Sequence, residues 1–360
     1  MISTDVLIIG GGLSGLALAD QLQRTDVKFH LLEARARFGG RIKVLDASGG
    51  KFDLGPSWFW PGQPRMAAIA QRFGLNVFDQ YATGALSYEN EQGDVMRNQG
   101  WSSMEGSLRI AGGMTALVDR LVKALPAENL TLNQPIARLV RVGEMVEAFD
   151  ANGDLVGQTK QVVLALPPRV ASKLTFEPAL PGGTMQKMNS ISTWMAGHAK
   201  FVAVYDTAFW RTAGLSGDAM SRHGPMVEIH DASDPRSGLG AIFGFLGVPA
   251  NIRAGQHQVV IDACVAQLAR VFGSQAREPV EVFLQDWAFE TETSTTADQT
   301  PPLGHPHYGM PQALADLWDG KLLFGSTEVA PQFGGFLEGA LEAAENAAQH
   351  ISAARSPIAD

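Results

Sequence analysis

Three glycines near the amino terminus have the spacing that lets a peptide backbone approach a pyrophosphate. Gly10, Gly12 and Gly15 form the pattern GxGxxG within DVLIIGGGLSGLALADQL, and we assign Leu13 and Ser14 to the same turn. A side chain at these glycines would block the tight turn, the approach to the phosphates and the packing of the next helix. A helix start also offers free N–H groups and the positive end of its dipole. The pattern predicts a dinucleotide site.

A carboxylate follows where the adenosine ribose of a dinucleotide is bound. Glu33 ends a second apolar segment, VKFHLLE, 18 residues after Gly15. A carboxylate at the end of this strand accepts hydrogen bonds from the ribose hydroxyls. GxGxxG by itself is weak evidence, and a solvated surface position for Glu33 is the alternative. The glycines and the acid together favour dinucleotide binding.

These residues need a strand, a turn and a helix in that order. Residues 6 to 9 are continuously apolar, which predicts a buried parallel strand over residues 5 to 9. Residues 10 to 15 then form the turn, and residues 16 to 23 have the apolar spacing of an amphipathic helix. This part of the chain is predicted to be an α/β fold of the Rossmann type.

The segment EARARFGGRI, which begins at Glu33, resembles the flavin-containing amine oxidase family, which includes monoamine oxidases, polyamine oxidases and L-amino acid oxidases. That family has an acid, a basic residue, a glycine pair and a further arginine. The matching residues are Glu33, Ala34, Arg35, Gly39, Gly40 and Arg41. Planar guanidinium groups suit a cofactor with two phosphates. Plain NAD-binding domains do not need this second basic element, so the resemblance implies FAD.

Later segments resemble the parts of the family that surround the flavin. FDLGPSWFWPGQPRM resembles the segment beside the flavin ring, and TLNQPIARL resembles the strand that meets the adenine. GKLLFGSTEVAPQFGGFLEGALEAAENAAQHI resembles the closing strand, polar turn and helix, whose first N–H groups stabilise reduced flavin. The corresponding residues are Gly55, Pro56, Ser57, Trp58, Ile136, Ser326, Thr327, Glu328, Phe336 and Leu337. Pro56 offers no N–H, and Ile136 has a core position as its alternative.

Three side chains are expected to take part in catalysis. Lys200, in GHAKFVAVYDTAFW, resembles the family lysine that reaches a water at the reactive flavin nitrogen. A lysine in an apolar strand is costly unless it is paired or functional, and burial would lower its pKa. The alternative is a lysine on an edge strand in water.

Trp287 matches a family tryptophan near the flavin, with a core indole as the alternative. Phe336 matches one wall of the substrate site, or only packs over the flavin.

Two features of monoamine oxidases are missing. TETSTTADQT contains neither the cysteine that binds flavin covalently in those enzymes nor the tyrosine beside it. We therefore expect noncovalent FAD and only half of the usual aromatic pair. Residues 77 to 105 stand where larger members carry a helical insertion, which predicts a more open substrate site. The chain also ends soon after the last helix, so we expect no membrane anchor.

The resemblance implies an amine oxidase or glutathione reductase-like FAD fold with two interleaved domains. The Rossmann-type FAD-binding domain would comprise residues 1–76, 106–178 and 301–354. An α+β substrate domain would comprise residues 77–105 and 179–300, and residues 355–360 would form a tail. Two segments rich in Gly, Pro, Ser and Asp, SGDAMSRHGPMVEIHDASDPRSG and TETSTTADQTPPLGHPHYG, are expected to be loops at the rim of the cavity.

Composition excludes several classes of protein. The 360 residues are 45% hydrophobic and 18% charged, which is typical of a globular chain with two domains. The net charge of -9 and the lack of clustered Lys and Arg argue against nucleic acid binding.

Cys264, the one cysteine, lies in an apolar helical pattern, so we expect a core thiol and a reducing compartment. Asp5 and the lack of a basic region argue against a signal peptide, and no run of about twenty apolar residues appears. We expect a cytoplasmic protein.

Two other kinds of chemistry have little support. His305 and His307, in GHPHYG, have no carboxylate or cysteine nearby, so we predict no metal site there and favour a loop beside the substrate pocket. No GxSxG nucleophile motif of a hydrolase is present.

The matches imply a flavoprotein that oxidises an amine. Hydride transfer from the amine to the flavin would form an imine, and reoxidation by O2 would yield hydrogen peroxide. A small-molecule amine and O2, or another electron acceptor, are the expected partners. The same fold serves desaturases and isomerases of apolar polyenes or tetrapyrrole precursors, which remain an alternative together with a nonenzymatic flavoprotein.

Overall fold

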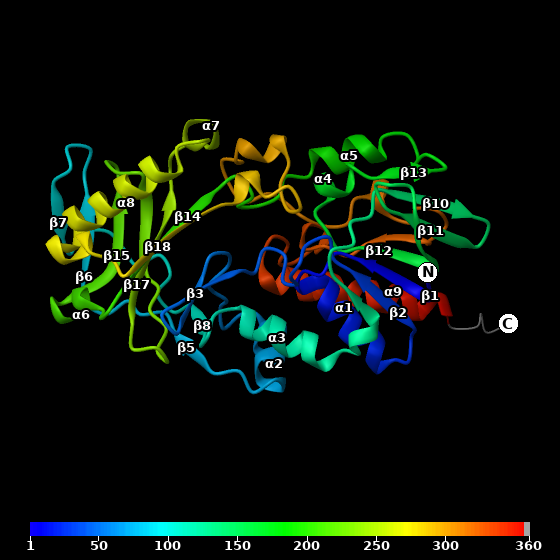
Figure 1. The fold of residues 1–360 in the computed structure, drawn as a ribbon, viewed down its shortest axis with the longest axis horizontal. Helices are drawn as coiled ribbons and strands as arrows, with labels where there is room; N and C mark the ends of the chain where they lie inside the picture. The colour runs from blue at the N-terminus through cyan, green and yellow to red at the C-terminus, as the bar shows by residue number, and fades with distance from the viewer. Residues whose placement is uncertain (356–360) are drawn as a thin grey trace.

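The computed structural model describes residues 1–355 and contains two large sheets. They lie at opposite ends of an elongated molecule, and the amino terminus is beside the larger, eight-stranded sheet (Figure 1). The second sheet has seven strands. Smaller hairpins and helices fill the middle of the view. Of the predicted tail, only the first residue lies within the described chain.

Strand β1 (Ile2–Ile9) is at the centre of the eight-stranded sheet and runs parallel to both of its neighbours. It begins three residues before the predicted strand. Val6 and Ile8 pack into one core and Leu7 into another, because successive side chains of a strand point to opposite faces. In spatial order the sheet contains β13 (Thr175–Glu177), β10 (Arg138–Val142), β11 (Met145–Phe149), β12 (Leu155–Leu164), β1, β2 (Phe29–Leu32) and β9 (Leu130–Thr131), and β19 (Leu322–Phe324) pairs with β12.

Helices cover both faces of this sheet. On one face, α1 (Leu13–Arg24) packs against α9 (Leu337–Arg355) and α3 (Thr115–Ala124). On the other face lie α4 (Pro168–Ala171) and α5 (Thr184–Ser190). Burial on both faces explains why β1 has the continuous apolar run that the sequence shows. Helix α1 starts three residues earlier than predicted.

Strand β14 carries the predicted lysine through the interior of the seven-stranded sheet. Its alternate residues pack on opposite faces: Phe201 lies under α8 (His257–Phe272), and Val202 lies in the core on the other face. In spatial order the strands are β18 (Glu281–Asp286), β14 (Ala199–Tyr205), β17 (Gly240–Leu246), β16 (Met226–Asp231), β15 (Leu215–Ser221), β6 (Ala85–Glu89) and β7 (Val95–Arg97).

The predicted rim loop at residues 216–238 is wrong for most of its length, because β15 and β16 occupy it. Its polar residues misled the prediction. Ser216 and Asp218 are buried, and tertiary hydrogen bonds satisfy them, so they do not need water. Composition alone does not separate such a strand from a loop.

Several smaller elements complete the fold. They are the hairpin β3 (Val44–Ala47) and β4 (Gly50–Asp53), the pair β5 (Val77–Asp79) and β8 (Leu108–Ile110), and the helices α2 (Pro64–Arg72), α6 (Phe209–Thr212) and α7 (Ala250–Arg253). The β5 and β8 pair joins strands from the two sides of the predicted boundary at residues 105 and 106. The division into domains stays a prediction. Within residues 1–355 no helix has the length and hydropathy needed to cross a bilayer.

Candidate active site

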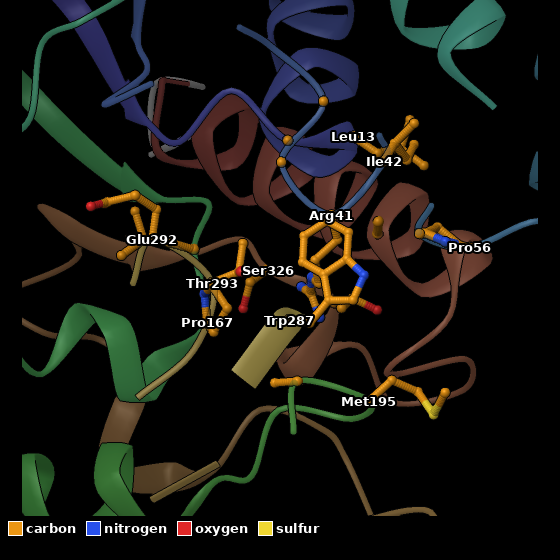
Figure 2. A pocket seen from close by; sticks show the side chains of 18 of the residues that line it. Leu13, Arg41, Ile42, Pro56, Pro167, Met195, Trp287, Glu292, Thr293 and Ser326 are labelled. Carbon is orange, nitrogen blue, oxygen red and sulfur yellow. The ribbon is translucent and has the colours of Figure 1, made fainter. Parts of the chain in front are cut away.

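One cavity of about 930 Å³ brings together nearly all of the predicted site residues. The residues that line it include Gly10, Gly12, Leu13, Ser14, Glu33, Ala34, Arg35, Gly39, Gly40, Arg41, Gly55, Pro56, Ser57, Trp58, Ile136, Lys200, Trp287, Ser326, Thr327, Phe336 and Leu337. Figure 2 shows part of this wall, with Trp287 and Arg41 at the centre of the view. Two predicted residues, Gly15 and Glu328, do not line the cavity.

The glycine turn opens one end of the cavity to a ligand. A Cβ on Gly12 would meet no atom within 4 Å, so the backbone there faces open space. A Cβ on Gly15 would lie 2.0 Å from the Gly10 carbonyl oxygen, so Gly15 serves packing within the motif. Gly12 precedes α1, and no side chain of residues 1–355 caps that helix. Its first N–H groups are therefore available to a phosphate.

Glu33 is held firmly at the end of β2. Its Oε2 accepts a hydrogen bond from the Gly11 N–H at 2.8 Å, and its Oε1 accepts one from the Arg35 N–H at 2.9 Å. Each carboxylate oxygen has a second lone pair, which remains for a ligand hydroxyl. Glu33 is buried and lines the cavity, so a surface position for this residue is wrong.

Arg41 reaches the cavity with the support of a buried carboxylate. Its Nη1 donates to Glu328 Oε1 at 2.7 Å, and Glu328 is fully buried. Burial lowers the pKa of Arg41, but the Glu328 carboxylate outweighs this and raises the pKa above its usual value. Glu328 thus acts on the site through Arg41 instead of lining it.

Ile136 lies in the loop between β9 and β10 and not in a strand. The predicted strand TLNQPIARL is interrupted there, and Asn133 has a positive φ of 56°. Ile136 is half-buried, lines the cavity and packs against the core on one face of the sheet. It therefore combines the predicted cavity position with the core position that was its alternative.

Lys200 is buried in the interior of a sheet, and its exposed fraction is 2%. The edge-strand alternative is wrong, because β14 pairs with a strand on each side. The Nζ atom donates to Ser57 Oγ at 2.7 Å and to the Gly55 carbonyl oxygen at 3.1 Å. It also lies 3.8 Å from the centre of the Phe243 ring.

The environment of Lys200 favours its neutral form. Burial lowers the pKa of Lys200 to about 7, which the nearby Asp53 carboxylate opposes and the Arg109 guanidinium assists. Arg109 is itself buried, and its Nη atoms donate to the carbonyl oxygens of Ser233 and Ala232. A lysine with this pKa can hold or release a proton near neutral pH.

Trp287 presents its indole to the cavity and is anchored by its nitrogen. Its Nε1 donates to the Leu54 carbonyl oxygen at 2.9 Å, and its exposed fraction is 8%. In the view of Figure 2, Ser326 lies on one side of Trp287 and Met195 on the other. Trp287 is thus both a well-packed indole and part of the wall.

Phe336 belongs to an aromatic group that the sequence did not predict. The His305 ring stacks on Phe336 with centres 4.9 Å apart and an angle of 12°. Trp60 meets Phe336 edge to face at 6.2 Å, and Trp194 packs on His305 at 5.1 Å. Trp60, Trp194 and Phe336 line the cavity. The missing aromatic partner of Phe336 is thus replaced by rings from other segments.

Sequence reasoning missed several further residues of the wall. They are Trp60, Met104, Trp194, Met195, His198 and Phe245. Val227 and Glu228 also line the cavity, and they belong to the segment 216–238 that was expected at its rim. Trp60 had a detectable signal, because it lies two positions after Trp58 in the matched segment. Met104 comes from the stretch that we expected to leave the site open. Within the described part of the chain, no group of three His, Cys, Asp or Glu residues is arranged to bind a metal.

The chain matches protein families along most of its length. Residues 77–352 match the family described as flavin containing amine oxidoreductase, and residues 8–73 match an NAD(P)-binding Rossmann-like domain. The flavin-containing amine oxidase A of Equus caballus is 24% identical over 99% of this chain and 86% of that protein. An L-amino acid dehydrogenase of a Synechocystis species is 23% identical over 97% of this chain and 95% of that protein.

Solved structures show the same fold. Cyclohexylamine oxidase from Brevibacterium oxydans has a TM-score of 0.81 at 20% identity, with 98% of this chain and 99% of that chain covered. Wild-type putrescine oxidase bound to putrescine has a TM-score of 0.79 at 20% identity, with the same shares covered. The matched residues 77–352 include Lys200, Trp287, Trp194 and Phe336. This chain belongs to the flavin-containing amine oxidoreductase family.

Proposed function

We propose that this protein uses noncovalently bound FAD to oxidise an amine to an imine, with O2 as the electron acceptor and hydrogen peroxide as a product. One continuous cavity supports the proposal, because it joins the glycine turn and Glu33 to the wall that carries Lys200 and Phe336. A dinucleotide at one end would thus place its reactive ring beside a lysine and aromatic side chains.

The residues at the cofactor end fit FAD. Open space at Gly12 lies where a pyrophosphate needs room, and the start of α1 supplies N–H groups. Ser326 Oγ is buried in the cavity wall and has no hydrogen-bond partner among residues 1–355. A buried hydroxyl without a partner is costly, and a polar edge of the flavin would satisfy it.

Noncovalent attachment is supported by the position of the single cysteine. Cys264 lies in α8 with no exposed surface, packed in the core on the helix side of the seven-stranded sheet. It does not line the cavity, and burial raises the pKa of its thiol to about 12. The thiolate that a cysteine link to flavin requires is therefore neither near nor favoured.

FAD, when bound, would supply a two-electron acceptor for the α hydrogen of the amine as its nitrogen loses a proton, and O2 would receive the two electrons and two protons as hydrogen peroxide. The protein orients the amine between the rings of Trp60, Trp194 and Phe336 and excludes water from one side. Lys200 Nζ holds or releases a proton near Ser57. The first N–H groups of α9, near Leu337, stabilise negative charge. Water then hydrolyses the imine to a carbonyl compound and ammonia.

The relatives support an amine as the substrate, but they do not decide between O2 and another electron acceptor. Those named above include amine oxidases and a putrescine oxidase, whose names specify amines. The L-amino acid dehydrogenase among them favours a second candidate, in which another acceptor replaces O2. The two candidates share the first half of the reaction.

A panel of amines added to the purified protein tests the proposal. We expect a yellow protein whose FAD is released by acid precipitation, whose flavin absorbance is bleached by an amine without oxygen, and which forms peroxide in air. Bleaching without peroxide would favour the dehydrogenase. A protein that binds no FAD, or that only an apolar polyene bleaches, would overturn amine oxidation.

A further inference from the structure

Three side chains from adjacent strands form a row along the cavity wall. Lys200 on β14 is directly opposite Phe245 on β17, which is directly opposite Glu228 on β16. Opposed residues on neighbouring strands point to the same face of a sheet, and all three line the cavity. Two strand spacings separate the backbones of Lys200 and Glu228 by about 10 Å. A carboxylate therefore lies at a fixed distance from the candidate reaction centre.

One oxygen of Glu228 is held and the other is available. Oε1 accepts hydrogen bonds from His230 Nε2 at 3.0 Å and from the Ser103 hydroxyl. Oε2 has no hydrogen-bond partner among residues 1–355, and the side chain is 26% exposed. The fixed oxygen restricts the carboxylate plane, so the free oxygen is presented to the cavity in a defined direction.

His230 links Glu228 to a second carboxylate. Its Nδ1 lies 2.9 Å from Asp218 Oδ1, so each ring nitrogen faces a carboxylate oxygen. A neutral imidazole has only one N–H, so this arrangement needs the imidazolium. Burial lowers the pKa of His230, but the hydrogen bonds to Asp218 and Glu228 outweigh this and raise it. Two carboxylates and one imidazolium leave one negative charge in excess.

Among the described residues, no lysine or arginine neutralises this excess charge. Among residues 1–355, no lysine or arginine forms an ion pair with Glu228, whose only charged contact is His230. Its neighbours on the cavity wall include Val227 and Phe245, which are apolar. Hydrogen bonds from His230 and Ser103 lower the pKa of Glu228 in spite of its burial, so the carboxylate stays ionised and its negative charge attracts a cation.

We propose that Glu228 binds a second positive charge of the substrate, so that the substrate is a diamine or polyamine. The distal ammonium donates to Glu228 Oε2 while the reacting amine lies toward Lys200. His230 and Asp218 are positioning residues, because they act through Glu228. This inference rests on the proposed function and names the substrate class for the same cavity.

Rapid mixing of the FAD-bound protein with amines in the absence of oxygen tests the proposal, because it separates the Kd from the limiting rate of flavin reduction. The probes are diamines from 1,4-diaminobutane to 1,8-diaminooctane, each compared with the monoamine of equal length. We expect at least one diamine to bind roughly tenfold or more tightly than its monoamine, since a hydrogen bond between two charged groups is stronger than one between neutral groups.

Substitution of the carboxylate gives the sharper result. Glu228→Gln should raise the Kd of that diamine at least about tenfold and raise the Kd of the monoamine of equal length much less. Glu228→Asp should restore part of the discrimination. Glu105→Gln is the matched control, because Glu105 is exposed beside Met104 and lies outside the cavity wall. Thermal unfolding of each variant checks that it folds.

The outcomes separate this inference from the proposed function. Equal Kd values for diamines and monoamines, or equal weakening of both by Glu228→Gln, would overturn the diamine site while amine oxidation stands. If no amine reduces the flavin, the proposed function fails, and calorimetric titration of the same diamines still decides the site. Diamine binding that disappears in Glu228→Gln would then support it, and no binding would overturn it.

Discussion

The dinucleotide end of the cavity is built mainly from backbone and short motifs within residues 10 to 41, whereas the opposite end is built from side chains of strands far apart in the sequence. At the first end, glycines leave space and N–H groups point outward. At the second end, Lys200, Phe245 and Glu228 meet only because three strands share one register. A backbone motif can be recognised in a short stretch of sequence, whereas a row of side chains across a sheet cannot.

The two ends also differ in charge. Arg35 and Arg41 place positive charge beside the glycine turn, which suits the phosphates of a cofactor. At the other end, Glu228 supplies a negative charge and burial favours a neutral Lys200. An anionic cofactor and a cationic substrate would each be drawn to the end that suits it.

The largest expected effect lies at the dinucleotide end. Gly15→Ala places a Cβ 2.0 Å from the Gly10 carbonyl oxygen, so the turn must shift and the phosphate site is lost. We expect the purified variant to retain almost no FAD, measured as the ratio of flavin to protein absorbance after gel filtration. Gly182→Ala is the control, because a Cβ there meets no atom within 4 Å. Full retention of FAD by Gly15→Ala would contradict this account of the turn.

At the other end, the buried lysine should make stability depend on pH. Burial lowers the pKa of Lys200 to about 7 in the folded protein, from 10.5 in its ordinary state. Between these two pH values the unfolded chain binds more protons than the folded chain, so the unfolding free energy rises with pH. Below this window both states are protonated, and the folded state carries the full cost of the buried charge.

Lys200→Met removes this dependence. The unfolding free energy of the wild type minus that of the variant should rise by up to several kcal/mol across this pH window. The expected slope is about 1.4 kcal/mol for each pH unit. Urea unfolding of the FAD-bound proteins at several pH values measures it. Lys123→Met, at an exposed position of α3, is the control. A difference that stays constant with pH would show that Lys200 keeps its ordinary pKa.

The same substitution tests the chemistry of the substrate end. Lys200→Met should slow the reaction of reduced flavin with O2 by roughly tenfold or more, because the Nζ beside Ser57 no longer holds a proton there. The Kd of the amine should change less. Mixing of the reduced protein with oxygenated buffer gives the rate. Unchanged oxygen reactivity would rule out this role for Lys200.

The smallest effect concerns the aromatic wall. His305→Ala removes the ring that stacks on Phe336 at 4.9 Å, and such a contact is worth about 0.5–1.5 kcal/mol. We expect the KM of an arylalkylamine to rise about two- to tenfold, with a smaller change in kcat. His307→Ala is the matched control, because His307 is also exposed and makes no ring contact within residues 1–355. If both variants behave alike, Phe336 does not depend on the stack.

Much of the cofactor end was predictable because its signals are local. The order of strand, glycine turn and helix, the acid at Glu33 and the core position of Cys264 are all found as expected. The helix start was misplaced by three residues, since the positions after Gly12 read equally well as turn. Glu328 was assigned to the cavity because of its neighbours in the sequence, yet it faces Arg41.

The substrate end was less predictable because polar residues there are satisfied by distant partners. Residues 216–238 looked like a loop, but Asp218 is buried against His230 and lies in a strand. Glu228 gave no local signal, since its role depends on the strands beside it. His305 stacks on Phe336, and these two residues belong to segments that are not adjacent in the sequence.

By itself the sequence determined a dinucleotide-binding turn, a Rossmann-type sheet and the family to which the chain belongs. Glycine spacing and apolar periodicity fix these features, because they act on backbone within a few residues. Only the tertiary structure shows that Lys200 is buried, that its row ends at Glu228 and that Oε2 of this carboxylate has no hydrogen-bond partner among residues 1–355. Those features depend on the register between strands, which no single segment specifies.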